Sequence, residues 1–181
     1  LEKLRELEAA GNYEEADTWF QDHLQNKKRP DSYQYLGWLQ VEYLASPLKT
    51  THRELDLKTG LATSHHTLED GTEITQKVLA SMPDDVIVLR ISANKPIDLR
   101  VSMDGATVVD GDLVKRAAAS GDNATQYEGR VRVLADGQTT QREQGLDIGE
   151  GRDVTIFVSA ATNYDRKQAG EMLPEGWNLK A

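Results

Sequence analysis

The sequence predicts a mostly β fold, an antiparallel sandwich preceded by a short helical hairpin. Apolar residues recur with helical spacing over about the first 24 residues, and after Pro30 the spacing changes to the period of two that is typical of strands. Turn signals such as Asp70-Gly71 and Asp136-Gly137 separate the alternating segments at roughly even intervals. About eight to ten strands in this pattern favour a sandwich built as a meander.

The first 29 residues are expected to form a helical hairpin that packs on the sandwich. Gly11-Asn12 is a stop signal between two amphipathic segments. The apolar stripe of the first segment contains Leu1, Leu4, Leu7 and Ala10, and that of the second contains Tyr13, Ala16, Phe20 and Leu24. The spacing resembles half of a tetratricopeptide unit, but only one copy occurs, and repeats need stacked neighbours to bury their apolar faces. We therefore expect a single hairpin, with Trp19 in its core, and no repeat array.

Residues 30–164 are expected to form the β-sandwich domain, and residues 165–181 an irregular tail or linker. The expected strands include Leu39–Tyr43, Leu55–Leu57, Leu61–Leu68, Glu73–Ser81, Val86–Ala93, Ile97–Met103, Arg130–Leu134 and Val154–Ala161. Turns are expected at Asn94-Lys95-Pro96 and at Glu150-Gly151-Arg152, and a loop from Ala117 to Gln126. The runs Val86–Leu89 and Val154–Val158 are almost continuously apolar, which predicts a central position or cover on both faces.

The charge and composition exclude several classes of function. A net charge of −9 argues against nucleic acid and anionic membranes as partners, because both repel an acidic surface. The chain has no cysteine, so it holds neither a disulfide framework nor a thiolate metal site. No apolar run approaches the length that spans a membrane. Because the chain begins at Leu1 inside an expected helix, we expect it to be trimmed, and its compartment stays open.

No residue pattern predicts a catalytic centre, a metal site or a cofactor. His65 and His66 are neighbours in an expected strand and point to opposite faces, so they are ordinary strand histidines. Asp84-Asp85 fits a solvated turn that leads into the buried strand. Neither a nucleophile elbow nor a phosphate loop occurs, and no carboxylate pair is nominated for glycoside hydrolysis.

Carbohydrate is a ligand that the remaining aromatic residues could bind. Aromatic rings can stack on the face of a pyranose, and several polar and aromatic residues cluster directly after the hairpin. The candidates for carbohydrate contact are Tyr33, Gln34, Tyr35 and Trp38. The pattern by itself favours the alternative, in which this cluster is the packed start of a strand.

Four segments together resemble a known family. They are Tyr33–Leu39, Arg53–Gly60, Val78–Ile91 and Ala160–Tyr164. In this order and spacing they are similar to the N-terminal β super-sandwich domain of bacterial α-L-fucosidase-type glycoside hydrolases (family ninety-five), truncated at both ends. The chain departs from the family pattern at Tyr35, where proline is usual, and at Trp38, where aspartate is usual.

The resemblance implies a non-catalytic domain. The family hydrolyses terminal fucosides or related L-sugars with inversion, and its catalytic groups lie in a later (α/α) barrel that this chain lacks, as it lacks the family's opening strands. The implied partners are a carbohydrate, met through the parent enzyme, and that helical catalytic domain, with a periplasmic or secreted location. The expected role is to support the barrel and to contribute to the substrate entrance. A free-standing carbohydrate-binding module and a protein-interaction domain that uses the helical hairpin are the alternatives.

Overall fold

The computed structural model describes residues 1–24, 34–119 and 125–164. The chain divides into two compact units, Leu1–Tyr33 and Gln34–Ala181, and each is taken by itself. The expected tail at residues 165–181 and the candidate Tyr33 lie outside the described residues.

The described part of the first unit, residues 1–24, contains two short helices, α1 (Glu2–Ala9) and α2 (Tyr13–His23). Gly11 adopts a positive φ of 76° between them, and the amide of Asn12 donates to the carbonyl of Leu7 at 2.9 Å, which closes the end of α1. Leu7 and Ala16 are buried between the helices. Trp19 is half-buried and stacks on His23, so the expected core position of Trp19 is only partly realised. The packing of this hairpin on the sandwich stays a prediction.

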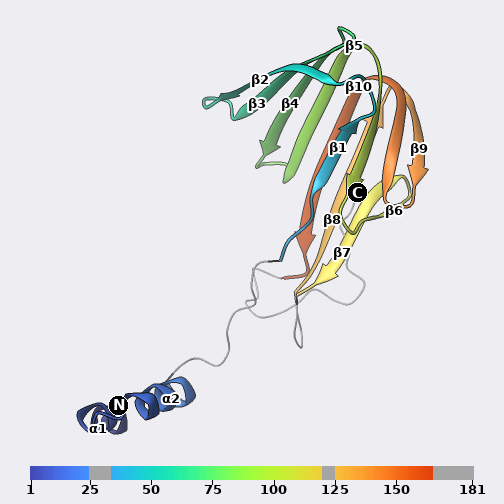
Figure 1. The fold of residues 1–181 in the computed structure, drawn as a ribbon. Helices are drawn as coiled ribbons and strands as arrows, with labels where there is room; N and C mark the ends of the chain where they lie inside the picture. Colours follow the sequence, from blue (N-terminus) through green and yellow to red (C-terminus); the bar gives the residue numbers. More distant parts are fainter. Residues whose placement is uncertain (25–33, 120–124, 165–181) are drawn as a thin grey trace. The chain divides into compact units, whose positions relative to one another are not determined.

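In residues 34–119 and 125–164, ten antiparallel strands form one continuous sheet (Figure 1). Along the main path the strand order is β2-β3-β4-β5-β10-β8-β7-β6, with β1 added beside β5 and β9 beside β10. The strands are β1 (Leu39–Tyr43), β2 (Leu48–Asp56), β3 (Leu61–Leu68), β4 (Glu73–Ser81), β5 (Val86–Met103), β6 (Thr107–Val109), β7 (Asp112–Ala118), β8 (Gln126–Ala135), β9 (Gln138–Arg142) and β10 (Gly145–Thr162). The predicted mostly β, antiparallel fold is confirmed.

The long strands β5 and β10 turn this sheet into two layers. The first half of β5 pairs with β4, and its second half pairs with β1. Strand β10 runs antiparallel to β5 along both halves, and it pairs first with β9 and then with β8. The second layer therefore has the order β1-β5-β10-β9, and the first layer holds all the other pairings. Because the non-consecutive strands β5 and β10 form the centre, the sheet is not the simple meander that the spacing suggested.

The bend between the layers lies where the sequence predicted two turns, and that prediction is wrong. Residues 94–96 lie inside β5 and residues 150–152 inside β10, at the shifts of register between the two strands. Asp136 accepts the amides of Arg152 and Asp153 at 2.8 and 3.0 Å, and Asp98 accepts the amide of Glu150 at 2.9 Å. Proline and glycine mark a bulge in a continuous strand as readily as a hairpin, which explains the error.

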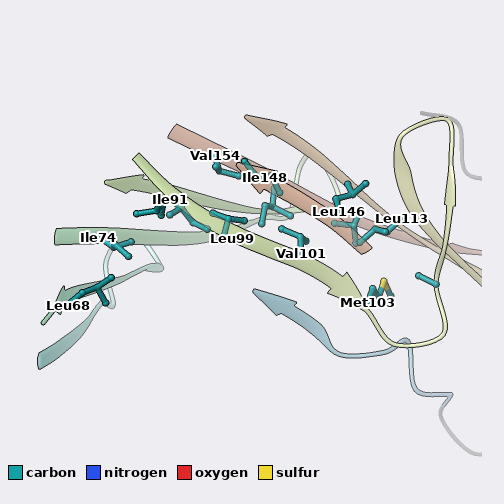
Figure 2. Close-up of a cluster of buried hydrophobic side chains, with 14 residues drawn as sticks. Leu68, Ile74, Ile91, Leu99, Val101, Met103, Leu113, Leu146, Ile148 and Val154 are labelled. Atoms are coloured by element: carbon teal, nitrogen blue, oxygen red, sulfur yellow. The ribbon is translucent and has the colours of Figure 1, made fainter. Parts of the chain in front are cut away.

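The hydrophobic core fills the space between the two layers (Figure 2). It takes alternate residues of the two central strands, such as Leu99 and Val101 of β5 and Leu146 and Ile148 of β10, all of which are almost fully buried. The continuous apolar runs Val86–Leu89 and Val154–Val158 lie at the centre of the sheet, as predicted. They are not covered on both faces, because Ile87 is 46% exposed. The sequence missed β6, β7 and β9, and residues 117 and 118, expected in a loop, end β7.

Candidate functional site

The outer face of the β1-β5-β10-β9 layer carries two rows of polar residues. On β1, Leu39 and Val41 pack against the core, so the alternate residue Gln40 faces outward. Gln40 lies opposite Ser102 of β5, which lies opposite Gly145 of β10, and Gly145 lies opposite Arg142 of β9. Side chains of one row in neighbouring strands share a face. One polar row thus crosses all four strands, and its only side-chain gap is at Gly145.

The neighbouring row is centred on a cluster of charges. It contains Glu42, Arg100, Asp147 and Thr140, one from each strand. Arg100 donates to both carboxylate oxygens of Asp147, with Nε–Oδ1 at 2.7 Å and Nη2–Oδ2 at 3.1 Å. Arg142, from the first row, also donates to Oδ2 of Asp147, at 2.8 Å. A single carboxylate thus fixes two guanidinium groups from two different strands.

A groove of about 940 Å³ lies over these rows. Its lining combines two aromatic residues, two arginines, two acidic groups and several neutral polar groups. The lining residues are Tyr35, Trp38, Gln40, Arg100, Ser102, Met103, Asp104, Arg142, Glu143, Gln144 and Gly145. A Cβ atom at Gly145 would lie 3.0 Å from the carbonyl oxygen of Val101, so the absence of a side chain there keeps the floor low. The groove is therefore polar, with an aromatic rim.

The aromatic rim is set by the segment that leads into β1. Leu36 points inward over Gly129 of β8, where a Cβ atom would lie 2.7 Å from its Cδ1 atom. Gly37 has a φ of 137°, and a side chain there would lie 3.2 Å from the carbonyl oxygen of Asp104. With Leu36 held inward and the chain turned at Gly37, Tyr35 and Trp38 stay at the surface.

Trp38 is presented by an extension of the β1–β5 ladder. The amide of Asp104 donates to the carbonyl oxygen of Trp38 at 3.2 Å, one step beyond the pairing of Leu39 with Met103. Because Leu39 packs against the core, Trp38 faces outward, and it is 68% exposed. A large aromatic side chain with this exposure beside polar groups is available for contact with a ligand or a partner.

Tyr35, three residues before Trp38, is held by residues of β7 and β8 in the first layer. The ammonium group of Lys115 lies 5.1 Å from the centre of the Tyr35 ring, which is a cation–π contact. The hydroxyl of Tyr127 donates to the carbonyl oxygen of Tyr35 at 3.2 Å. Desolvation, and secondly the charge of Asp104, raise the pKa of the Tyr35 phenol, so Tyr35 is a neutral donor near pH 7.

The electrostatics of Asp147 suit an ion pair better than proton transfer. The hydrogen bonds from Arg100, supported by those from Arg142, lower the pKa of Asp147 to about 2. Asp147 is therefore ionised at neutral pH and unsuited to be a general acid. Asp147 in turn raises the pKa of Arg100. Across residues 1–24, 34–119 and 125–164 no group of three or more His, Cys, Asp or Glu side chains could hold a metal ion. In the same residues, no helix is both long and apolar enough to span a membrane.

The structure brings together two of the four predicted carbohydrate contacts. Tyr35 and Trp38 line the groove, whereas Gln34 is exposed but is not part of the lining, and Tyr33 lies outside the described residues. Sequence reasoning missed the polar residues of the floor and far wall, such as Arg100 and Arg142. Their signal was the outward position of alternate strand residues, but only the pairing of β9, β10 and β5 places them beside Trp38.

Comparisons with known proteins identify the family of this chain. The family model described as "Glycosyl hydrolase family 65, N-terminal domain" matches residues 1–167. The chain is also 33% identical over 111 residues to "Alpha-L-fucosidase 2" of Arabidopsis thaliana, a match that covers 58% of this chain and 13% of the relative. The predicted glycoside hydrolase N-terminal domain is confirmed, whereas the narrower family ninety-five and the bacterial source stay predictions. The chain belongs to the family of N-terminal domains of glycosyl hydrolase family 65.

Proposed function

We propose that this chain is the non-catalytic N-terminal domain of an α-L-fucosidase-type glycoside hydrolase, of the kind found in family ninety-five. In this proposal the domain supports a helical catalytic barrel, and its groove contributes to the substrate entrance. The observation that carries the proposal is the convergence of Tyr35 and Trp38 on one polar groove. The likeness to a plant α-L-fucosidase 2 supports the choice of sugar.

The groove offers the two kinds of contact that a neutral sugar needs. The C–H groups on one face of a pyranose carry a small positive charge, which is attracted to the electron-rich face of an indole such as Trp38. Sugar hydroxyls can accept hydrogen bonds from Arg142 and Arg100 and exchange them with Gln40 and Ser102. The two arginines are already balanced in part by Asp147, so the wall does not demand an anionic ligand.

The state of Asp147 supports a contact role for this groove. An inverting glycosidase needs a general acid, whose pKa is usually raised, and a base about 6.5–9.5 Å away. Asp147 has the opposite property, because two arginines hold its pKa down to about 2. Asp147 is thus unsuited to be the general acid, and in this proposal the hydrolytic step belongs to the remainder of the parent enzyme.

Binding of a fucosylated oligosaccharide to the full chain tests the proposal. We expect the amide signals of the groove residues in ¹H–¹⁵N spectra to shift on titration, and Trp38→Ala to weaken binding at least tenfold, about 1.4 kcal/mol. Trp19→Phe, which changes a tryptophan of the helical unit, is the control and should leave the affinity unchanged. Equal binding by Trp38→Ala, or no binding by the unaltered chain, would refute the sugar contact.

Two further measurements separate the parts of the proposal. An aryl α-L-fucoside should not be hydrolysed by this chain, and clear turnover would contradict the non-catalytic role. In the parent enzyme, Trp38→Ala should raise KM with little change in kcat, because the groove is proposed to bind substrate away from the reacting bond. Tight binding of glycans without fucose would instead favour a carbohydrate-binding module.

A further inference from the structure

The groove beside Trp38 runs across the strands of the second layer, and its two ends differ in chemistry. At the β1 end lie Trp38, which is 68% exposed, and Tyr35, which is also exposed. At the β9 end lie Arg142 and the turn residues Glu143 and Gln144, all of them exposed. An aromatic surface and a set of hydrogen-bonding groups therefore stand at opposite ends of one groove.

The distance between these ends follows from the strand pairing. From β1 to β9 the groove crosses the three pairings Gln40–Ser102, Ser102–Gly145 and Gly145–Arg142. Neighbouring strands are about 4.8 Å apart, so the three steps cover about 14 Å. The guanidinium group of Arg142 reaches back to Asp147 of β10, which leaves about two steps, about 10 Å, between it and β1. One pyranose unit is about as long as one step, so a single sugar does not contact both ends.

The floor between the two ends is made of small residues. Gly145 has no side chain, and a Cβ atom there would lie 3.0 Å from the carbonyl oxygen of Val101. Ser102, in register with Gly145, is partly buried and lines the groove. Arg100 borders this floor and is fixed by both carboxylate oxygens of Asp147. A ligand can therefore lie across β5 and β10 and reach from one end to the other.

Arg142 is fixed through one atom and keeps its other donors for a ligand. Its Nε atom donates to Oδ2 of Asp147 at 2.8 Å, and this is the one side-chain hydrogen bond that Arg142 makes within the described residues. The two Nη groups carry four further N–H donors in one plane. Neighbouring hydroxyls of a pyranose present two acceptor oxygens side by side, which suits such a planar set of donors. The β9 end is thus prepared for a sugar unit of its own.

We propose that the groove binds an extended oligosaccharide, with one unit stacked on Trp38 and the next or a later unit held by Arg142. This inference rests on the proposed function and names the class of its ligand. The volume of about 940 Å³ agrees with it, because pockets for small molecules cover about 300–1,000 Å³ and this groove lies at the upper end of that range. The indole and the guanidinium group add their contributions only for a ligand that is long enough to reach both.

Two ligands of different length test the proposal with the full chain. Methyl α-L-fucoside has one sugar unit and fucosyllactose has three, and both are titrated in ¹H–¹⁵N spectra. We expect fucosyllactose to bind about thirtyfold more tightly or better, and to shift the amide signals of both Trp38 and Arg142. Equal affinity of the two ligands would overturn the extended site and leave the proposed sugar contact standing. Absence of binding by both would refute the proposed function and this inference with it.

Two variants show whether both ends act on the same ligand. Trp38→Ala and Arg142→Gln should each weaken fucosyllactose binding about tenfold or more, whereas only one of them should weaken methyl α-L-fucoside binding. A variant that merely distorted the groove would weaken both ligands alike, so this difference separates contact from structural support. Arg90→Gln is the matched control, because Arg90 also pairs with an aspartate, Asp153, but on the outer face of the first layer, and it should leave both affinities unchanged. The proposal is wrong if either groove variant leaves fucosyllactose binding unchanged, or if both weaken methyl α-L-fucoside binding.

Discussion

Replacing Asp147 by asparagine should destabilise the sheet domain at neutral pH. It should also reduce the fall in the free energy of unfolding between about pH 4 and pH 2. Asparagine keeps the shape of the side chain and removes the charge that Arg100 and Arg142 share. Asp147 is only 16% exposed, so water cannot fully replace the lost interaction. Two guanidinium groups would then stand together on the face of β5 and β9 without their common counter-ion.

The magnitude follows from the pKa of Asp147. A fall from 3.8 to about 2 corresponds to about 2.4 kcal/mol at face value. Because the side chains of Arg100 and Arg142 are 42% and 60% exposed, solvent screens the interaction. We therefore expect the free energy of unfolding to fall by about 1 to 1.5 kcal/mol at pH 7.

The sign of the pH dependence is fixed by the lowered pKa. A carboxyl group whose pKa is lower in the folded chain stabilises it fully above the unfolded pKa, and the gain is lost as pH falls from 3.8 towards 2. Urea unfolding followed by circular dichroism at pH 7, 4 and 3 measures this loss. The difference between the native chain and Asp147→Asn should shrink to about half by pH 3.

An ion pair on the outer face of the first layer provides the control. Asp153 pairs with Arg90 at 3.1 Å, but both side chains are more than half exposed, so Asp153→Asn should change stability by at most about 0.5 kcal/mol. If Asp147→Asn costs no more than Asp153→Asn at pH 7, or if its cost stays constant down to pH 3, the assigned role of Asp147 is wrong.

Two glycine variants test the geometry of the bend and of the groove. Gly137→Ala should lower the free energy of unfolding by about 2–3 kcal/mol, because its Cβ would lie 2.7 Å from the amide nitrogen of Gly151. Gly149→Ala is the control: its contacts are no closer than 3.8 Å, so it should cost at most about 0.5 kcal/mol in the same urea assay. Equal costs of the two variants would contradict this account of the bend. Gly37→Ala should cost about 1–3 kcal/mol and shift the NMR signals of Trp38, since alanine is strained at a φ of 137°; unchanged stability and signals would show that Gly37 does not set the aromatic rim.

The sequence alone determined the fold class and the positions of most strands along the chain, and it nominated Tyr35 and Trp38 as candidate contacts. Strict alternation, as in Leu39–Tyr43, identifies a strand with one buried face, because successive side chains point to opposite sides. The apolar runs in β5 and β10 located the centre of the sheet for a similar reason. Tyr35 and Trp38 were accessible to sequence reasoning because their type and clustering indicate a surface contact.

Local sequence did not determine which strands pair, and the site depends on pairing. Asn94-Lys95-Pro96 and Glu150-Gly151-Arg152 carry turn signals, yet both lie in strands that continue through a bend, since the hydrogen bonds of Asp98 and Asp136 hold the bulged backbone.

Arg100 and Asp147 are 47 residues apart in the chain, and they meet only because β10 lies beside β5. The alternation of apolar and polar residues fixes the buried face of each strand. The groove beside Trp38 follows from long-range strand pairing, and the exposure of Ile87 follows from the unequal widths of the two layers.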